Sequence, residues 1–130
     1  MPARAEITGL WIGGVDASKR KTLDAISKDD LKKVFYGIKG FRPENTPALR
    51  LVVGLFIDKE LHKYYTTTIT KENEGKELAN WFEYPPAQRT PGRHTIQFKI
   101  ATADNVDDKT RKVTGWPLGE SKEFPFEIGA

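Results

Sequence analysis

The clearest hydrophobic pattern in the chain follows a Pro-Gly turn at residues 91–92. His94 and three apolar residues occupy every second position up to Ile100, and the positions between them are polar: Thr95, Gln97 and Lys99. A period of two is typical of a strand with one buried face. We therefore expect residues 94–100 to form a central strand of a β-sandwich, with His94 on its core-facing side.

Four other segments have the composition of strands. Residues 6–16 contain three glycines, which predicts a bulge, a bend or the close approach of another backbone. Residues 32–41 alternate in the same way as the central strand. Residues 49–58 are apolar on both faces, which is typical of a middle strand or an interface. Residues 62–71 are β-branched and aromatic, and we expect them to form a hairpin with the preceding strand.

Two further strands complete the expected set. Residues 78–84 fit a helical turn as well as a strand, and the β-rich context favours a strand. The last strand, 124–128, contains Pro125, which has no amide to donate, so we expect an edge strand or one paired on a single side. Ser27 and Asp30 match a helix capping box, and this predicts one short helical turn near residues 27–33.

These elements predict an all-β fold. Strands and helices do not alternate, which argues against a parallel α/β sheet, and no internal repeat is visible. A chain of 130 residues fits one domain. We expect a single antiparallel two-sheet β-sandwich of about seven strands.

The run from Pro91 through Ile100 to Asp104 resembles the penultimate strand of immunoglobulin-like and fibronectin-III-like domains. In that resemblance, residues 124–128 are the hairpin partner. The chain departs from the pattern because it has no cysteine pair, places His94 where a tyrosine is frequent, and has a long connection over residues 104–120. The resemblance implies an architecture and no particular activity.

Composition excludes several classes of chemistry. The net charge is +3, from 21 basic and 18 acidic residues, and the basic residues are dispersed rather than gathered in a tail. Without cysteine there is no disulfide, thiolate metal site or cysteine nucleophile. Residues 1–6 lack the apolar core of a signal peptide, and the longest apolar run, 51–57, is too short to span a bilayer. We expect a cytoplasmic protein, with export without a cleaved signal as the alternative.

Catalytic residue types are scarce. The chain has three serines, two histidines and no Gly-x-Ser-x-Gly elbow, so a hydrolytic triad is disfavoured. The glycines of residues 9–14 lack the lysine of a phosphate-binding loop. If His94 is buried, we expect it to be neutral and hydrogen-bonded, because burial opposes its charge. We predict no enzymatic activity and no cofactor.

Charged clusters give two weak candidate sites. Asp104, Asp107 and Asp108 are oxygen ligands of the kind that calcium takes, but they lack the EF-hand spacing, and we interpret them as a solvated loop. A basic patch for phosphate or nucleic acid would use the following side chains: Lys19, Arg20, Lys21, Arg89 and Arg93. A solvated surface is the preferred interpretation of these residues.

Aromatic residues near turns and strand ends give the remaining candidate surface. Trp81, Tyr84 and Trp116 could stack on sugar rings or contact a protein. The one-sided last strand and the glycine-rich first strand also leave an edge for strand addition. We predict a non-catalytic structural or protein-interaction module that binds a protein partner or a second copy. A carbohydrate-binding module is the first alternative, and a nucleic-acid-binding sandwich is the second.

Overall fold

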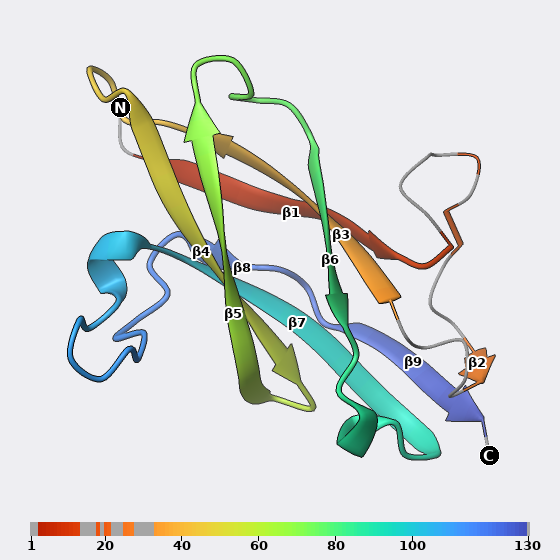
Figure 1. Cartoon of the computed structure of the whole chain (residues 1–130). Helices are drawn as coiled ribbons and strands as arrows, with labels where there is room; N and C mark the ends of the chain where they lie inside the picture. The colour runs from red at the N-terminus through yellow and green to blue at the C-terminus, as the bar shows by residue number, and fades with distance from the viewer. Residues whose placement is uncertain (1–2, 14–17, 19, 22–24, 28–32, 130) are drawn as a thin grey trace.

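The computed structural model describes residues 3–13, 18, 20–21, 25–27 and 33–129. Within this part of the chain the strands form two stacked sheets (Figure 1). The smaller sheet has the order β1-β3-β6 and contains these strands: β1 (Arg4–Trp11), β3 (Lys33–Phe41) and β6 (Leu78–Glu83). Both strand pairs in it are antiparallel.

The larger sheet has the order β2-β9-β7-β4-β5, with β8 also paired to β7. Its strands are β2 (Ala25–Ser27), β4 (Ala48–Ile57), β5 (Glu60–Thr70), β7 (Gly92–Thr102), β8 (Gly119–Glu120) and β9 (Phe124–Gly129). Only the short β2 runs parallel to its neighbour, β9, among the described pairs. The helical elements with described bounds are the 3-10 turns η2 (Pro86–Gln88) and η3 (Ala103–Asn105). The expected all-β, two-sheet sandwich is confirmed.

Strand β7 lies at the centre of the larger sheet, as its pattern predicted. It pairs with β9 on one side and β4 on the other. Its core-facing side chains are buried, from His94 to Ile100. Phe98 joins the two sheets, because its ring lies 4.7 Å from that of Tyr36 on β3 and 6.1 Å from that of Phe82 on β6, measured between centroids.

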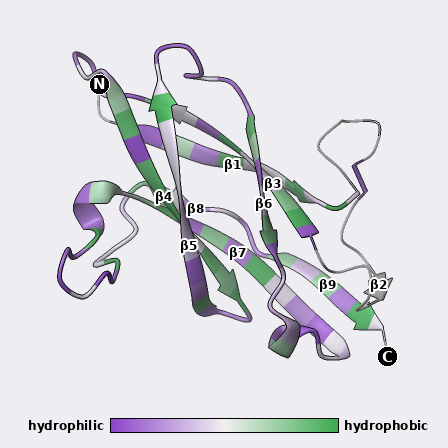
Figure 2. Cartoon of the chain, in the orientation of Figure 1, coloured by the Kyte–Doolittle hydropathy of each residue, from purple (hydrophilic) through white to green (hydrophobic). Residues whose placement is uncertain are grey.

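Strand β4 is apolar on both faces because both faces are covered, and Figure 2 shows its largely hydrophobic colouring. Its inner face belongs to the core. On the outer face, the long connection that follows β7 lays Trp116 over Gly54, where a Cβ atom would overlap the indole. Trp116 also meets Phe56 edge to face at 5.7 Å. The middle-strand prediction is therefore confirmed, and Gly54 provides the space for this packing.

The structure refines the ends of the expected elements. β1 carries the expected bulge, between Ile7 and Gly9; residues 14–16 of that expected strand lie outside the described part. Residues 78–83 form a strand, as favoured. Pro125 pairs with β7, but the end of β9 also pairs with β2, so one-sided pairing is wrong for that end. Ser27 ends β2, and residues 28–32 of the expected helical turn are outside the described part.

The turn between β4 and β5 predicts a stabilising substitution. Asp58 and Lys59 form a two-residue hairpin connection with φ of 50° and 72°, a left-handed geometry in which a side chain with a Cβ is strained. We expect Lys59→Gly to raise the free energy of unfolding by about 0.5–1 kcal/mol, measured by urea denaturation. Lys59→Ala, which removes the charge and keeps the Cβ, serves as the control and should stay within about 0.5 kcal/mol of wild type. Equal effects of the two substitutions would contradict this origin of the strain.

Candidate functional site

A hydrogen-bonded cluster around His94 closes one end of the sandwich. The His94 side chain is 9% exposed, and its Nδ1 lies 2.7 Å from Oδ2 of Asp58. Its Nε2 lies 2.7 Å from the carbonyl oxygen of Thr90. The second oxygen of Asp58 accepts the backbone N–H of Thr95 at 2.9 Å. The cluster therefore ties the β4–β5 turn to both β7 and the segment that precedes it.

The partners of His94 determine its protonation. A carboxylate and a carbonyl oxygen only accept hydrogen bonds, so both ring nitrogens must donate, and this requires the charged imidazolium. Burial lowers the pKa of His94, but the hydrogen bond to Asp58, the Thr90 carbonyl and the charge of Asp58 together raise that pKa above its ordinary value. The expectation of a buried, hydrogen-bonded His94 is confirmed, whereas the raised pKa and the two acceptors favour the charged ring over the expected neutral one.

The same cluster has the connectivity of a nucleophile–base–acid arrangement. The hydroxyl of Thr90 lies 3.2 Å from Nε2 of His94, and Asp58 binds the opposite nitrogen. A general base needs a free lone pair on the nitrogen that faces the nucleophile. Here that nitrogen donates to the Thr90 carbonyl, at a shorter distance than the hydroxyl. The cluster therefore lacks a free base and instead joins the β4–β5 turn to β7 and to the segment that precedes it.

An open depression of about 520 Å³ adjoins this cluster on the larger sheet. Arg93 of β7 and Glu127 of β9 line it as cross-strand neighbours. Sequence reasoning identified His94 but missed Asp58 and Thr90 as its partners. No local signal connects Asp58 to a histidine that lies far along the chain, and the contact arises only when β4 and β7 pair.

The outer face of the smaller sheet carries a row of three aromatic residues in register across β1, β3 and β6: Trp11, Phe35 and Trp81. The rings of Trp11 and Phe35 stack at 6.3 Å, and both side chains are buried. Trp81 is 52% exposed. The ammonium group of Lys33 lies over the indole ring of Trp81, 4.2 Å from its centroid, in a cation–π contact. We call these three residues the aromatic row.

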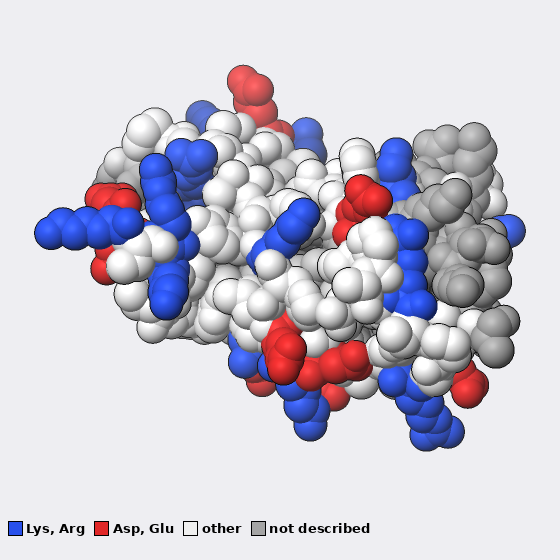
Figure 3. All heavy atoms as spheres, turned by 60° about the horizontal axis from the view of Figure 1, so that its bottom comes forward, with Lys and Arg blue, Asp and Glu red and all other residues white. Residues whose placement is uncertain are grey.

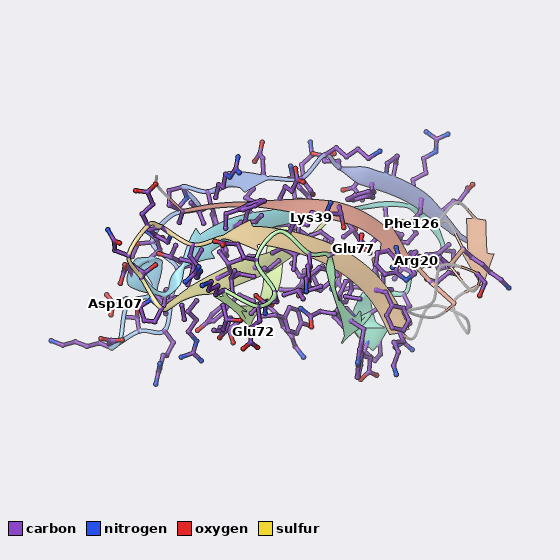
Figure 4. All side chains as sticks on the ribbon, turned by 90° about the horizontal axis from the view of Figure 1, so that it is seen from above. Arg20, Lys39, Glu72, Glu77, Asp107 and Phe126 are labelled. Atoms are coloured by element: carbon purple, nitrogen blue, oxygen red, sulfur yellow. The ribbon has the colours of Figure 1, made fainter. Side chains whose placement is uncertain are left out.

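A polar network lies beside the aromatic row. Glu77 accepts hydrogen bonds from the Thr8 hydroxyl at 2.6 Å and from the Arg20 guanidinium at 2.8 Å. These bonds, with the charges of Arg20 and Lys39, lower the pKa of Glu77 despite some burial. In Figure 4 Glu77 lies between Arg20 and Lys39. Arg20 also covers the ring of Trp11, 3.8 Å from its centroid. The network holds the Arg20 side chain against the sheet.

The predicted aromatic surface is not formed as one platform. Trp81 lies on the outer face of the smaller sheet, whereas Trp116 packs on the outer face of the larger sheet, against Gly54. Tyr84 is fully buried, and burial raises the pKa of its hydroxyl. Its assignment to a surface is wrong, because its ring fills the core against Phe126 at 5.9 Å.

The predicted basic residues are also separated. Arg20 binds Glu77, and Lys21 forms a backbone bridge to Ile12, the residue after β1; Lys19 lies outside the described residues. Arg89 donates to the carbonyl of Tyr84 at 2.8 Å, and Arg93 lies beside the depression on the larger sheet. On the face seen in Figure 3, lysine and arginine lie in separate groups with carboxylates between them.

The acidic loop is organised by its own backbone. Asp107 accepts the amides of Lys109 and Thr110 at 2.8 and 3.1 Å, and these bonds lower its pKa. Asp104 belongs to η3, and Asp108 is exposed. In the described part of the chain, no group of three or more His, Cys, Asp or Glu residues is arranged to hold a metal ion.

No helix among the described residues has the length and apolar character needed to cross a membrane.

Comparisons with known proteins bear on the fold. No family model and no curated protein matches the chain. The crystal structure of the CARDB domain of the PF1109 protein from Pyrococcus furiosus, in complex with di-metal ions, is similar at 16% identity. The match covers 98% of this chain and 92% of that one, with a TM-score of 0.55.

The solution structure of the same CARDB domain gives a TM-score of 0.49, again at 16% identity, and covers 98% of this chain and 94% of that one. At this identity the likeness concerns the fold and no residue of a site. The chain thus has an immunoglobulin-like β-sandwich fold, similar to that of the CARDB domain of PF1109.

Proposed function

We propose that this domain is a non-catalytic protein-interaction module that works within a protein assembly. The observation that carries the proposal is the exposure of Trp81. Its neighbours in the aromatic row, Trp11 and Phe35, are 5% and 8% exposed, whereas Trp81 is 52% exposed. Tryptophan is among the residues most enriched at the energetic centres of protein interfaces.

The surroundings of Trp81 suit contact with a protein. Lys33 lies over one face of the indole, and Glu83 of the same strand is exposed beside it. An apolar ring within a rim of both charges has the composition of an interface core and rim. Trp81 lies on the outer face of the sheet and lines neither the depression beside His94 nor the one beside Arg4 and Phe41, which suits a protein surface better than a small molecule.

The cluster around His94 supports the non-catalytic part of the proposal. It is the arrangement among the described residues that comes closest to a nucleophile with a base, through Thr90. Its imidazole has both nitrogens committed to Asp58 and to a carbonyl. Accepting a proton from a substrate would require one of these hydrogen bonds to break.

Site-specific photo-crosslinking tests the proposal. A benzoylphenylalanine in place of Trp81 is expected to form a covalent adduct with one protein in the cells that produce this chain. The adduct is identified by mass spectrometry, and that protein is then purified and titrated calorimetrically. Trp81→Ala should weaken its binding at least tenfold, because central interface tryptophans contribute about 2 kcal/mol or more.

The control replaces Lys109, an exposed residue of the β7–β8 connection, by the same photoreactive group. It should not give the adduct. A Trp81→Ala variant that is folded and binds the purified partner as tightly as wild type would overturn the proposal. The absence of any protein adduct at position 81 would do so as well.

A further inference from the structure

The free edge of β5 has a composition unlike that of the other sheet edges. In the described structure β5 pairs only with β4. Its stretch from Tyr64 to Thr70 contains no proline, glycine or charged residue. Other described edges differ: β1 contains a bulge, the part of β9 that β2 leaves unpaired contains Pro125, and two prolines come shortly after β6. An unprotected edge is a template for another strand.

The contacts of Asn73 show which backbone groups of β5 point away from β4. Its side-chain oxygen accepts the N–H of Thr70 at 2.8 Å, and its side-chain nitrogen donates to the carbonyl of Thr68 at 3.2 Å. Alternate residues of an antiparallel strand direct both backbone groups to the same side. The N–H and C=O groups of Thr66 and Tyr64 consequently point to the open edge, beyond the reach of these Asn73 contacts.

We propose that a second copy of this chain pairs with the open edge of β5, in an antiparallel, two-fold arrangement centred on Thr66. In this register Thr66 faces Thr66 of the copy, and the two residues exchange both N–H···O=C bonds. Tyr64 faces Thr68, whose N–H is also free. Thr66 and Thr68 are exposed, so their side chains are accessible to the copy. The proposal goes beyond the protein-interaction function because it concerns a surface other than that of Trp81.

Charge favours a second copy at this edge. A two-fold axis brings each residue opposite itself or opposite a residue equally far on the other side of the centre, so a charged edge would repel its own copy. From Tyr64 to Thr68 every pair in the register is neutral. Farther out, Lys63 faces Ile69 and Lys71 faces Leu61, so no two lysines meet; like charges meet where Glu60 faces Glu72, outside the paired stretch from Tyr64 to Thr68. The centre on Thr66 thus places both free backbone groups and uncharged side chains in register.

Sedimentation equilibrium of three Thr66 variants tests the proposal. Wild type is expected to form a dimer, as is Thr66→Ala, which keeps the amide. Thr66→Pro removes an N–H that is not used by β4, a position where an edge strand tolerates proline. It should raise the dimer dissociation constant at least tenfold while circular dichroism remains that of wild type. A strictly monomeric wild type at about 1 mM, well above the micromolar range of ordinary specific complexes, would overturn the proposal.

A charge-swap pair tests the register without relying on proline. Thr66→Lys alone and Thr66→Glu alone should each be monomeric, because like charges then face each other across the axis. An equimolar mixture of the two should associate as a heterodimer, and this association should weaken with salt. Dimers that persist in either variant alone, or a mixture that stays monomeric, would contradict pairing centred on Thr66. The Trp81→Ala variant should dimerise like wild type, which separates this interface from the surface around Trp81.

Discussion

Asp58→Asn is expected to lower the free energy of unfolding by about 2–3 kcal/mol at pH 6, measured by urea denaturation. The substitution removes the charge opposite His94, whose side chain is 9% exposed. It also replaces one acceptor oxygen by an NH₂ group, so the ring and the Thr95 amide no longer both find an acceptor. A buried charge without its partner costs several kcal/mol. Because Asp58 itself is 44% exposed, we place the loss at the lower end of that range.

The same cluster gives wild-type stability a defined pH dependence. The folded pKa of His94 is raised above its ordinary value of 6.5. The folded state therefore holds the proton more tightly than the unfolded state. The resulting stabilisation is complete below the unfolded pKa and is lost as the pH rises through the raised pKa. We expect wild-type stability to fall from pH 6 to pH 9 and the fall to be much smaller in Asp58→Asn.

Glu60→Gln is the matched control for Asp58→Asn. It changes the net charge by the same amount at an exposed neighbouring position and leaves His94 untouched. Its stability and pH profile should follow wild type within about 0.5 kcal/mol. A wild-type stability that is flat or rising across this interval would show that His94 is not held as the imidazolium.

Phe98→Ala is expected to destabilise the fold by about 3–5 kcal/mol. Phe98 is fully buried and is the ring through which β7 contacts both Tyr36 and Phe82 of the opposite sheet. Truncation removes the buried ring and leaves a cavity between the sheets that two other rings cannot fill without moving. Denaturant unfolding followed by circular dichroism measures the loss.

Phe98→Leu separates the cavity from the general loss of apolar contact. Leucine keeps most of the volume, so we expect less than half the effect of alanine. A similar loss for both variants would indicate that ring-to-ring contact dominates. A loss below about 1 kcal/mol for alanine would contradict the assignment of Phe98 as the contact between the sheets.

Much of the fold could be predicted from the sequence because most strands have a one-sided pattern. The alternation around Phe98 identified the central strand, and the apolar run of β4 identified its neighbour. Pairing between distant strands could not be predicted in the same way. No local pattern indicates that β6, which follows β5 in the chain, pairs with β3 in the other sheet. The short β2, which pairs with only three residues of β9, is also too small to leave a periodic pattern.

The candidate sites were less predictable for a related reason. Aromatic residues identify large side chains but do not show which sheet face they occupy, so Tyr84 in the core and Trp81 on the surface were grouped together. His94 was correctly placed on the core side. Its protonation depended on Asp58, a residue of a distant turn, and a pattern along one strand carries no information about such a partner.

The packing of Trp116 on Gly54 has a consequence for how this sequence can change over time. An indole at position 116 and any side chain at position 54 exclude each other, because the ring occupies the space where a Cβ would lie. Each residue thus limits what substitutions the other accepts, although they belong to separate segments of the chain. A larger residue at position 54 becomes acceptable only after a smaller one has appeared at position 116. The order of the two substitutions is therefore fixed by the packing.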